Sequence, residues 1–349
     1  MDNVIKNIIT TDNIANLILQ KYMSNKSFIE KFHKDGIEHI ANNYFTIVMF
    51  SFHEYRIFEE YNRPTITFLI FHDIIMDYFT NNYDSNNYDI KKINKIIYKT
   101  IKDNYKKYDD DRDFNEKFLQ GKINKKENNS YLLEIALFFG FIYDDFDLLI
   151  DNIVKYVKTI TINTIKTLTF ISIGILAFYA KTFYKTKDSL FAINMWIDKL
   201  IDIFIEKTID SKLPHLDNID KKKFIFMLMR YNSDFKCNES EFAFERSFDI
   251  NSCSIVKFNE NKFLPGYTAD QCFLFIYDAC LKCSHSFEFL LFTALTFTEI
   301  KHITFISSWL FFLSNPNFDF YKKFEIINGF QKIDEFVEYF NNLFKKNLV

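Results

Sequence analysis

The chain has few of the residues that build tight turns. Its 349 residues include only six Gly and four Pro, whereas β-sandwiches and β-barrels need many turns made from these residue types. Apolar residues recur instead at helical spacing in segments 37–52, 65–79, 131–157 and 336–346. We therefore predict an all-α protein, in which a multi-helix N-terminal region precedes a C-terminal helical bundle.

The sequence also lacks a basic excess, a signal peptide and a long apolar run. Proteins that bind nucleic acid carry positive charge, so the formal net charge of −3 predicts no nucleic-acid partner. The start, MDNVIKNIITTDN, has no charged segment followed by an apolar one, so we expect no secretory signal. Runs 167–180 and 303–318 fall short of the roughly 18 apolar residues of a membrane span, and we predict that they form buried core helices rather than a transmembrane span.

Common enzyme motifs are missing too. The sequence contains no P-loop, no GxGxxG, no GxSxG and no HExxH, which excludes the usual nucleotide-binding folds, serine hydrolases and zinc proteases.

One stretch departs from the overall charge balance. Residues 91–107, KKINKIIYKTIKDNYKK, surround an apolar stripe of Ile93, Ile97 and Ile101 with lysines. We interpret this stretch as a helix with a solvent-facing lysine side, with contact to an anionic surface as the alternative. The lysines are Lys91, Lys92, Lys95, Lys99, Lys102 and Lys106.

Composition divides the chain unevenly. Polar clusters at 77–89 and 109–129 interrupt the helical pattern, and we predict that the second is a linker. The first 236 residues contain no cysteine. We predict an N-terminal helical domain (1–125), a middle helical region (130–235) and a C-terminal domain (236–349). All five cysteines lie in this last domain: Cys237, Cys253, Cys272, Cys280 and Cys283.

The CxxC pair, Cys280 and Cys283, is the strongest chemical signal. Positions three apart share a helix face, so the sulfurs could approach bonding distance at a helix start. The positive end of the helix dipole would favour the thiolate there, and His285 could add to this effect. Such a dithiol cycles between reduced and oxidised forms when an electron acceptor is present. Two alternatives stay open, an inert buried pair and a zinc site completed by Cys253 and either Cys237 or His285.

A second motif follows at the distance of about one helix pair. The segment SSWLFFLSNPNFDFYKKFE (307–325) resembles the W-L-x-x-L-H-N-x-V-N-x-x-L-x-K helix of the small FAD-linked sulfhydryl oxidases, the Erv and augmenter-of-liver-regeneration family. The resemblance is to a diverged, baculovirus-like member and covers about residues 268–325. Ser314 stands where the family has His, and no W-x-x-x-H helix precedes the CxxC.

The resemblance implies an FAD-dependent thiol oxidase that makes disulfides in partner proteins. Cys280 would react with a substrate thiol, Cys283 would pass the electrons to FAD, and oxygen would be the final acceptor. The implied cofactor contacts are Trp309, Asn315, Lys322 and His285. A viral member of this family would act in the host cytoplasm or the virion, and a homodimer stays open.

Three other functions stay open. In FLIFHDIIMDYF, His72 and Asp73, together with His39, could hold the metal of an HD-type phosphohydrolase. Asp144, Asp145 and Asp147 resemble the magnesium-binding cluster of terpene synthases, although we interpret them as a solvated helix end. A non-enzymatic helical structural, virion or adaptor protein would use its cysteines only for packing.

Overall fold

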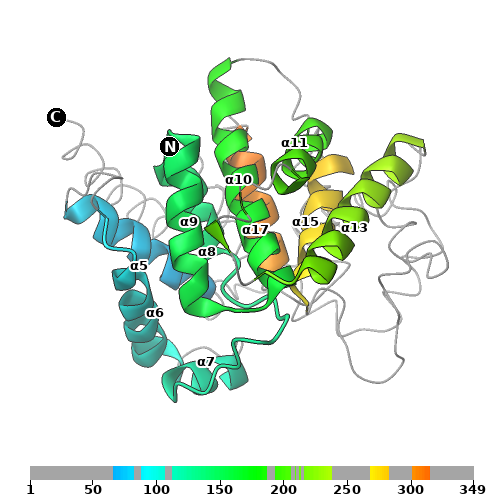
Figure 1. Ribbon diagram of the computed structural model, residues 1–349. Coiled ribbons are helices and arrows are strands. Elements are labelled where there is room, and N and C mark those ends of the chain that lie inside the picture. The colour runs from blue at the N-terminus through cyan, green and yellow to red at the C-terminus, as the bar shows by residue number, and fades with distance from the viewer. Residues whose placement is uncertain are drawn as a thin grey trace, which may run out of the picture.

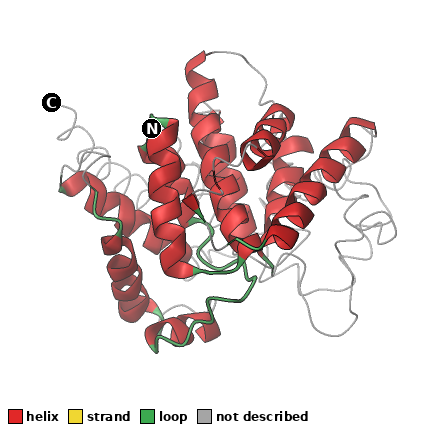
Figure 2. Cartoon of the chain, in the orientation of Figure 1, coloured by secondary structure: helices red, strands yellow, loops and turns green. Residues whose placement is uncertain are grey.

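The structure is a computed structural model that describes residues 66–81, 88–106, 112–186, 193–205, 209, 212–213, 216–237, 268–282 and 301–314. Helices account for 79% of this part of the chain, which confirms the all-α prediction (Figure 2). The β-structure of these ranges is one isolated antiparallel pairing, between Asn129 and Thr268. The described helices, in chain order, are α5 (Ile66–Thr80), α6 (Lys91–Asn104), α7 (Arg112–Leu119), α8 (Ile135–Ile142), α9 (Phe146–Ile160), α10 (Thr164–Thr186), α11 (Ile193–Ile205), α13 (Asn218–Cys237), α15 (Ala269–Lys282) and α17 (Lys301–Ser314).

Helix α10 is the centre of the bundle. It packs against α8, α9, α11, α13, α15 and α17, and Figure 1 shows these helices arranged around it. By length and composition its segment Thr164–Thr182 could cross a membrane, but 83% of the qualifying window is buried inside the protein. The helix is therefore buried, as the sequence predicted for run 167–180. The other predicted run was 303–318, and its residues 303–314 lie in α17. The described apolar side chains of α17 are buried as well.

Two glycines let α8 and α10 approach each other closely. A Cβ atom on Gly140 would lie 2.5 Å from Cβ of Ala177 and 2.8 Å from the backbone nitrogen of Phe178, and it would also collide with the carbonyl oxygen of Gly174. A Cβ atom on Gly174 would collide with Cδ1 of Ile153 in α9. Glycine is thus required at position 140, where an added atom would meet the backbone of α10, whereas at position 174 it would meet first the end of the Ile153 side chain.

The apolar stretch 131–157 forms two helices rather than one. Helix α8 ends at Ile142 and Tyr143 is extended. Asp145 then caps α9, and its Oδ1 accepts a 2.9 Å hydrogen bond from the backbone N–H of Leu148. Asp144, whose side chain is exposed, forms an ion pair with the largely buried Lys181 at 3.2 Å. The acidic cluster is therefore a solvated helix end, as the sequence indicated.

The first described helices pack against the same core as the later ones. Ile93, Ile97 and Ile101 of α6 are fully buried, while the lysines of this helix are exposed or half-buried, as predicted. The predicted linker 109–129 is wrong in part, because it contains α7. Phe114 of α7 is buried and stacks on Tyr131, with ring centroids 4.2 Å apart. One cluster of buried apolar side chains includes residues from all three predicted regions.

Candidate functional site

Cys280 lies near the C-terminal end of α15, not at a helix start as the sequence analysis expected. The carbonyl end of a helix carries negative partial charge, which does not favour a thiolate. The side chain is 2% exposed, and its Sγ donates a weak hydrogen bond of 3.9 Å to the carbonyl oxygen of Ser307 in α17. The thiol thus points into the contact between two helices.

Trp309 follows Ser307 by two residues in α17, and its side chain is also buried. Its ring centroid is 4.7 Å from that of Phe71, 6.1 Å from that of Phe141 and 6.3 Å from that of Phe305. Packed rings from α5, α8 and α17 therefore occupy the space beside the indole. In the described part of the chain, the indole is thus packed against phenylalanine rings from three helices.

The other predicted site residues are only partly covered by the structure. Asp73 accepts a 2.6 Å hydrogen bond from the hydroxyl of Thr100, which links α5 to α6. No group of three His, Cys, Asp or Glu side chains within the described ranges could hold a metal ion. The structure describes the backbone of His72 but not its side chain. The following candidates lie outside the described residues altogether: His39, Cys253, Cys283, His285, Asn315 and Lys322.

The structure brings together a buried polar cluster that the sequence analysis missed. It consists of Asn129, Glu134, Lys166 and Cys272, each no more than 5% exposed. Nζ of Lys166 donates a 2.6 Å hydrogen bond to Oδ1 of Asn129. Glu134 is near enough to affect the titration of both Lys166 and Cys272. Isolated charges inside apolar runs, such as Lys166 and Glu134, were the available signal in the sequence.

Burial controls the protonation of this cluster. Burial lowers the pKa of Lys166 to about 8, although the negative charges of Glu134 and Glu127 act in the opposite direction. Burial raises the pKa of the Cys272 thiol well above its usual value, and Glu134 and Asp270 add to the effect. Cys272 is therefore a neutral thiol near neutral pH. A lysine with a pKa of about 8 could act as a base or nucleophile, but this amine is closed off from solvent.

The cluster lies where three parts of the chain meet. We call residues 124–134 the junction loop. Its backbone accepts hydrogen bonds from the turn between α9 and α10, including 2.9 Å from the N–H of Ile162 to the oxygen of Lys125. Three residues further on, Asn128 donates a 2.8 Å hydrogen bond from Nδ2 to Oδ1 of Asp270 in α15. The arrangement serves to join α10 and α15 to the loop before α8.

A scan of protein-family models finds no match to this chain, and neither curated proteins nor solved structures give a match.

Proposed function

We propose that the chain is a non-enzymatic helical protein that acts as a structural or adaptor component, by binding rather than by thiol chemistry. The observation that supports this best is the position of Cys280. Its side chain is 2% exposed and faces the backbone of α17. Thiol–disulfide exchange needs an accessible thiolate. A cysteine closed inside a helix contact acts as a small apolar residue instead.

Alkylation footprinting tests this proposal directly. The folded chain is treated with N-ethylmaleimide, with and without urea, and digested with trypsin. Cleavage after Lys282 separates Cys280 from Cys283, so the two thiols are read on different peptides. We expect Cys280 to be labelled only in urea. Labelling of Cys280 in the folded chain at the rate of a free cysteine peptide would contradict the proposal.

The thiol oxidase is a second candidate, because the two motifs behind it do meet. Helices α15 and α17 pack together, and the Cys280 thiol is in contact with Ser307, two residues before Trp309. This candidate predicts a yellow protein with flavin absorbance and with thiol-dependent oxygen consumption that is lost in Cys280→Ser. A colourless protein with no oxygen consumption supports the non-enzymatic function.

A further inference from the structure

Helix α13 is apolar on two opposite faces. One face points into the core, where the ring of Phe224 lies 5.9 Å from that of Phe204 and 6.2 Å from that of Phe273. The other face exposes 65% of Ile219, 66% of Phe226 and 48% of Met229. These outer side chains are not among the buried core residues of the described ranges.

These three outer residues lie along one side of the helix, with Lys222 between Ile219 and Phe226. Ile219 and Phe226 are seven positions apart and Met229 follows three later, so all three share one side of the helix. They are half of the six large apolar side chains that are exposed in the described ranges. Clustered exposed apolar residues mark interaction sites, whereas scattered ones do not.

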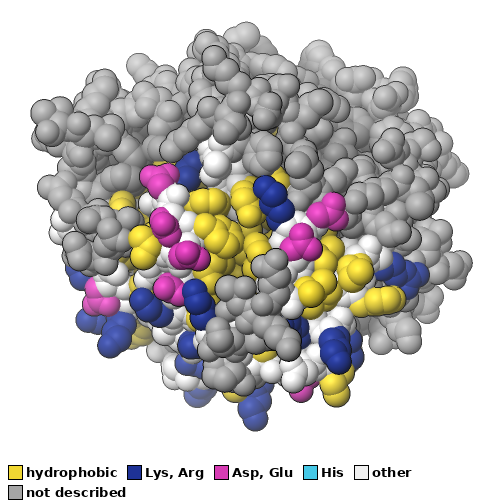
Figure 3. Space-filling view, turned by 45° about the horizontal axis from the view of Figure 1, so that its top comes forward, with side chains coloured by type: hydrophobic (Ala, Val, Ile, Leu, Met, Phe, Trp, Pro, Cys, Tyr) yellow, Lys and Arg dark blue, Asp and Glu magenta, His cyan; other side chains and the backbone are white. Residues whose placement is uncertain are grey.

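Positive charge lies among and beside these apolar residues. Lys222 stands between Ile219 and Phe226, Lys223 and Arg230 lie seven positions apart along the edge next to Ile219, and all three are exposed. Lys223 contacts Asp220 at 3.1 Å, but exposed pairs of this kind are weak and leave the cation available. Over α13, at the right of Figure 3, hydrophobic side chains lie beside Lys and Arg side chains. We call these six residues the α13 surface: Ile219, Lys222, Lys223, Phe226, Met229 and Arg230.

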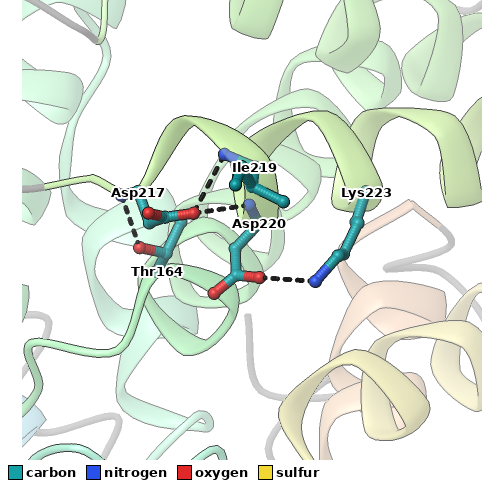
Figure 4. Close-up of polar contacts among 5 residues, drawn as sticks. All are labelled: Thr164, Asp217, Ile219, Asp220 and Lys223. Carbon is teal, nitrogen blue, oxygen red and sulfur yellow. Dashed lines mark hydrogen bonds and ion pairs between the residues drawn. The ribbon is translucent and has the colours of Figure 1, made fainter.

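The helix that carries this surface is firmly attached at its start. Figure 4 shows that Asp217 caps α13, with Oδ1 accepting 2.9 Å hydrogen bonds from the backbone N–H groups of Ile219 and Asp220. The backbone N–H of Asp217 in turn donates to Oγ1 of Thr164, in the first turn of α10, at 2.9 Å. A surface held in place in this way loses little conformational entropy on binding.

We infer that the α13 surface binds an acidic amphipathic helix of another protein. Anchors two helical turns apart match the repeat of apolar residues along a partner helix. The flanking cations favour Asp and Glu at the edges of that partner and disfavour basic sequences.

The inference builds on the proposed function, because it names a partner class for a protein that acts by binding. It depends on the α13 surface alone, however, and not on Cys280. If Cys280 is reactive, the proposed function is wrong, but the inference about the α13 surface stands. If the α13 surface binds no acidic helix, the inference is wrong, but the proposed function stands.

Peptide selection on the full-length chain tests the inference. A random peptide library is selected on the immobilised protein, and recovered peptides are labelled for fluorescence anisotropy. We expect peptides rich in Asp and Glu with apolar residues at helical spacing. Their affinity should fall at least about tenfold for Phe226→Ser. It should fall further for the triple variant K222E/K223E/R230E, and it should decrease as salt rises.

Matched controls make the result specific. Ile162 is also exposed by 48% but lies outside the α13 surface, so Ile162→Ser should bind the peptides like the unchanged chain. Circular dichroism confirms that each variant is folded. Neutral or basic peptides, or peptides that bind Phe226→Ser equally well, would overturn the inference. So would self-association, or binding to anionic phosphatidylserine vesicles, that Phe226→Ser abolishes, because the occupant would then be a second copy or a membrane.

Discussion

Lys166 donates a 2.6 Å hydrogen bond from its buried Nζ to Oδ1 of Asn129, which lies 37 residues earlier in the chain. This bond joins the first turn of α10 to the junction loop. It also places an amine in a site where burial lowers its pKa, so that the stability of the protein depends on pH.

The first prediction concerns that pH dependence. Burial lowers the pKa of Lys166 from 10.5 in the unfolded chain to about 8 in the folded one. Between these values the unfolded chain retains a proton that the folded chain has lost, so the free energy of unfolding rises with pH. Cys272 and Tyr156 have raised pKa values, and above about pH 9 the unfolded chain loses their protons first. The rise is therefore confined to about pH 8–9 and amounts to about 1 kcal/mol.

Urea unfolding, followed by circular dichroism across that pH interval, measures the rise. Lys166→Met should abolish it, whereas Lys155→Met, which replaces an exposed lysine of α9, should retain it. A rise that persists in Lys166→Met would assign the effect to another group.

The second prediction concerns the contact between α8 and α10. Gly140→Ala should lower the free energy of unfolding by about 3 kcal/mol or more, because the added methyl group meets backbone atoms of α10 that cannot move separately. Gly121→Ala is the matched control. Gly121 has a positive φ of 65° but open space around it, so its replacement should cost only about 1 kcal/mol. Equal losses in the two variants, measured by urea unfolding, would show that the helices can separate.

The third prediction concerns Lys181, which closes the C-terminal end of α8. Its Nζ donates hydrogen bonds to the backbone oxygens of Phe141, at 2.9 Å, and Tyr143, at 2.5 Å. Lys181→Met keeps most of the side-chain volume but leaves these carbonyls without their donor, and it should cost about 2 kcal/mol. Lys117→Met removes an exposed pair with Asp113 and should cost less than about 0.5 kcal/mol. Thermal unfolding of the two variants decides between a structural and a solvated role for Lys181.

The fourth prediction separates packing from hydrogen bonding at Trp309. The buried Nε1 of this residue has no hydrogen-bond partner in the described part of the protein. Trp309→Phe should therefore lower the free energy of unfolding by no more than about 1.5 kcal/mol, because the lost volume is offset by removal of an unpaired donor. Trp309→Ala opens a cavity among the Phe rings and should cost about 3–5 kcal/mol. Similar losses for both variants in urea unfolding would indicate a specific role for the indole N–H.

The sequence predicted those features that depend on local spacing. The buried stripe of Ile93, Ile97 and Ile101 follows from helical periodicity, and the solvated helix end at Asp144, Asp145 and Asp147 follows from three nearby acidic residues. The burial of α10 follows from an apolar run that contains no charge. In each case the residues that decide the structure lie within a few turns of each other.

Other features depend on partners that are distant in the chain. Spacing alone does not show that Gly140 faces Gly174, or that Lys166 meets Asn129. The helix that carries Cys280 was predicted, but the position of the cysteine within it was not, because helix ends depend on a few weak local contacts. In a chain with 44 Phe residues, an aromatic helix such as α17 arises readily from core packing, and this made the pattern around Trp309 a weak indicator of a cofactor.

Asn129 pairs with Thr268, so the junction loop obtains this partner, which directly precedes α15, only late in synthesis of the protein. The junction loop and α10 leave the ribosome well before α15 and α17, which cover part of α10. Until residue 314 has emerged, an apolar helix long enough to span a bilayer stays partly uncovered in the nascent chain. Translation products that stop before residue 268 should therefore aggregate or be held by chaperones, while the full-length chain folds.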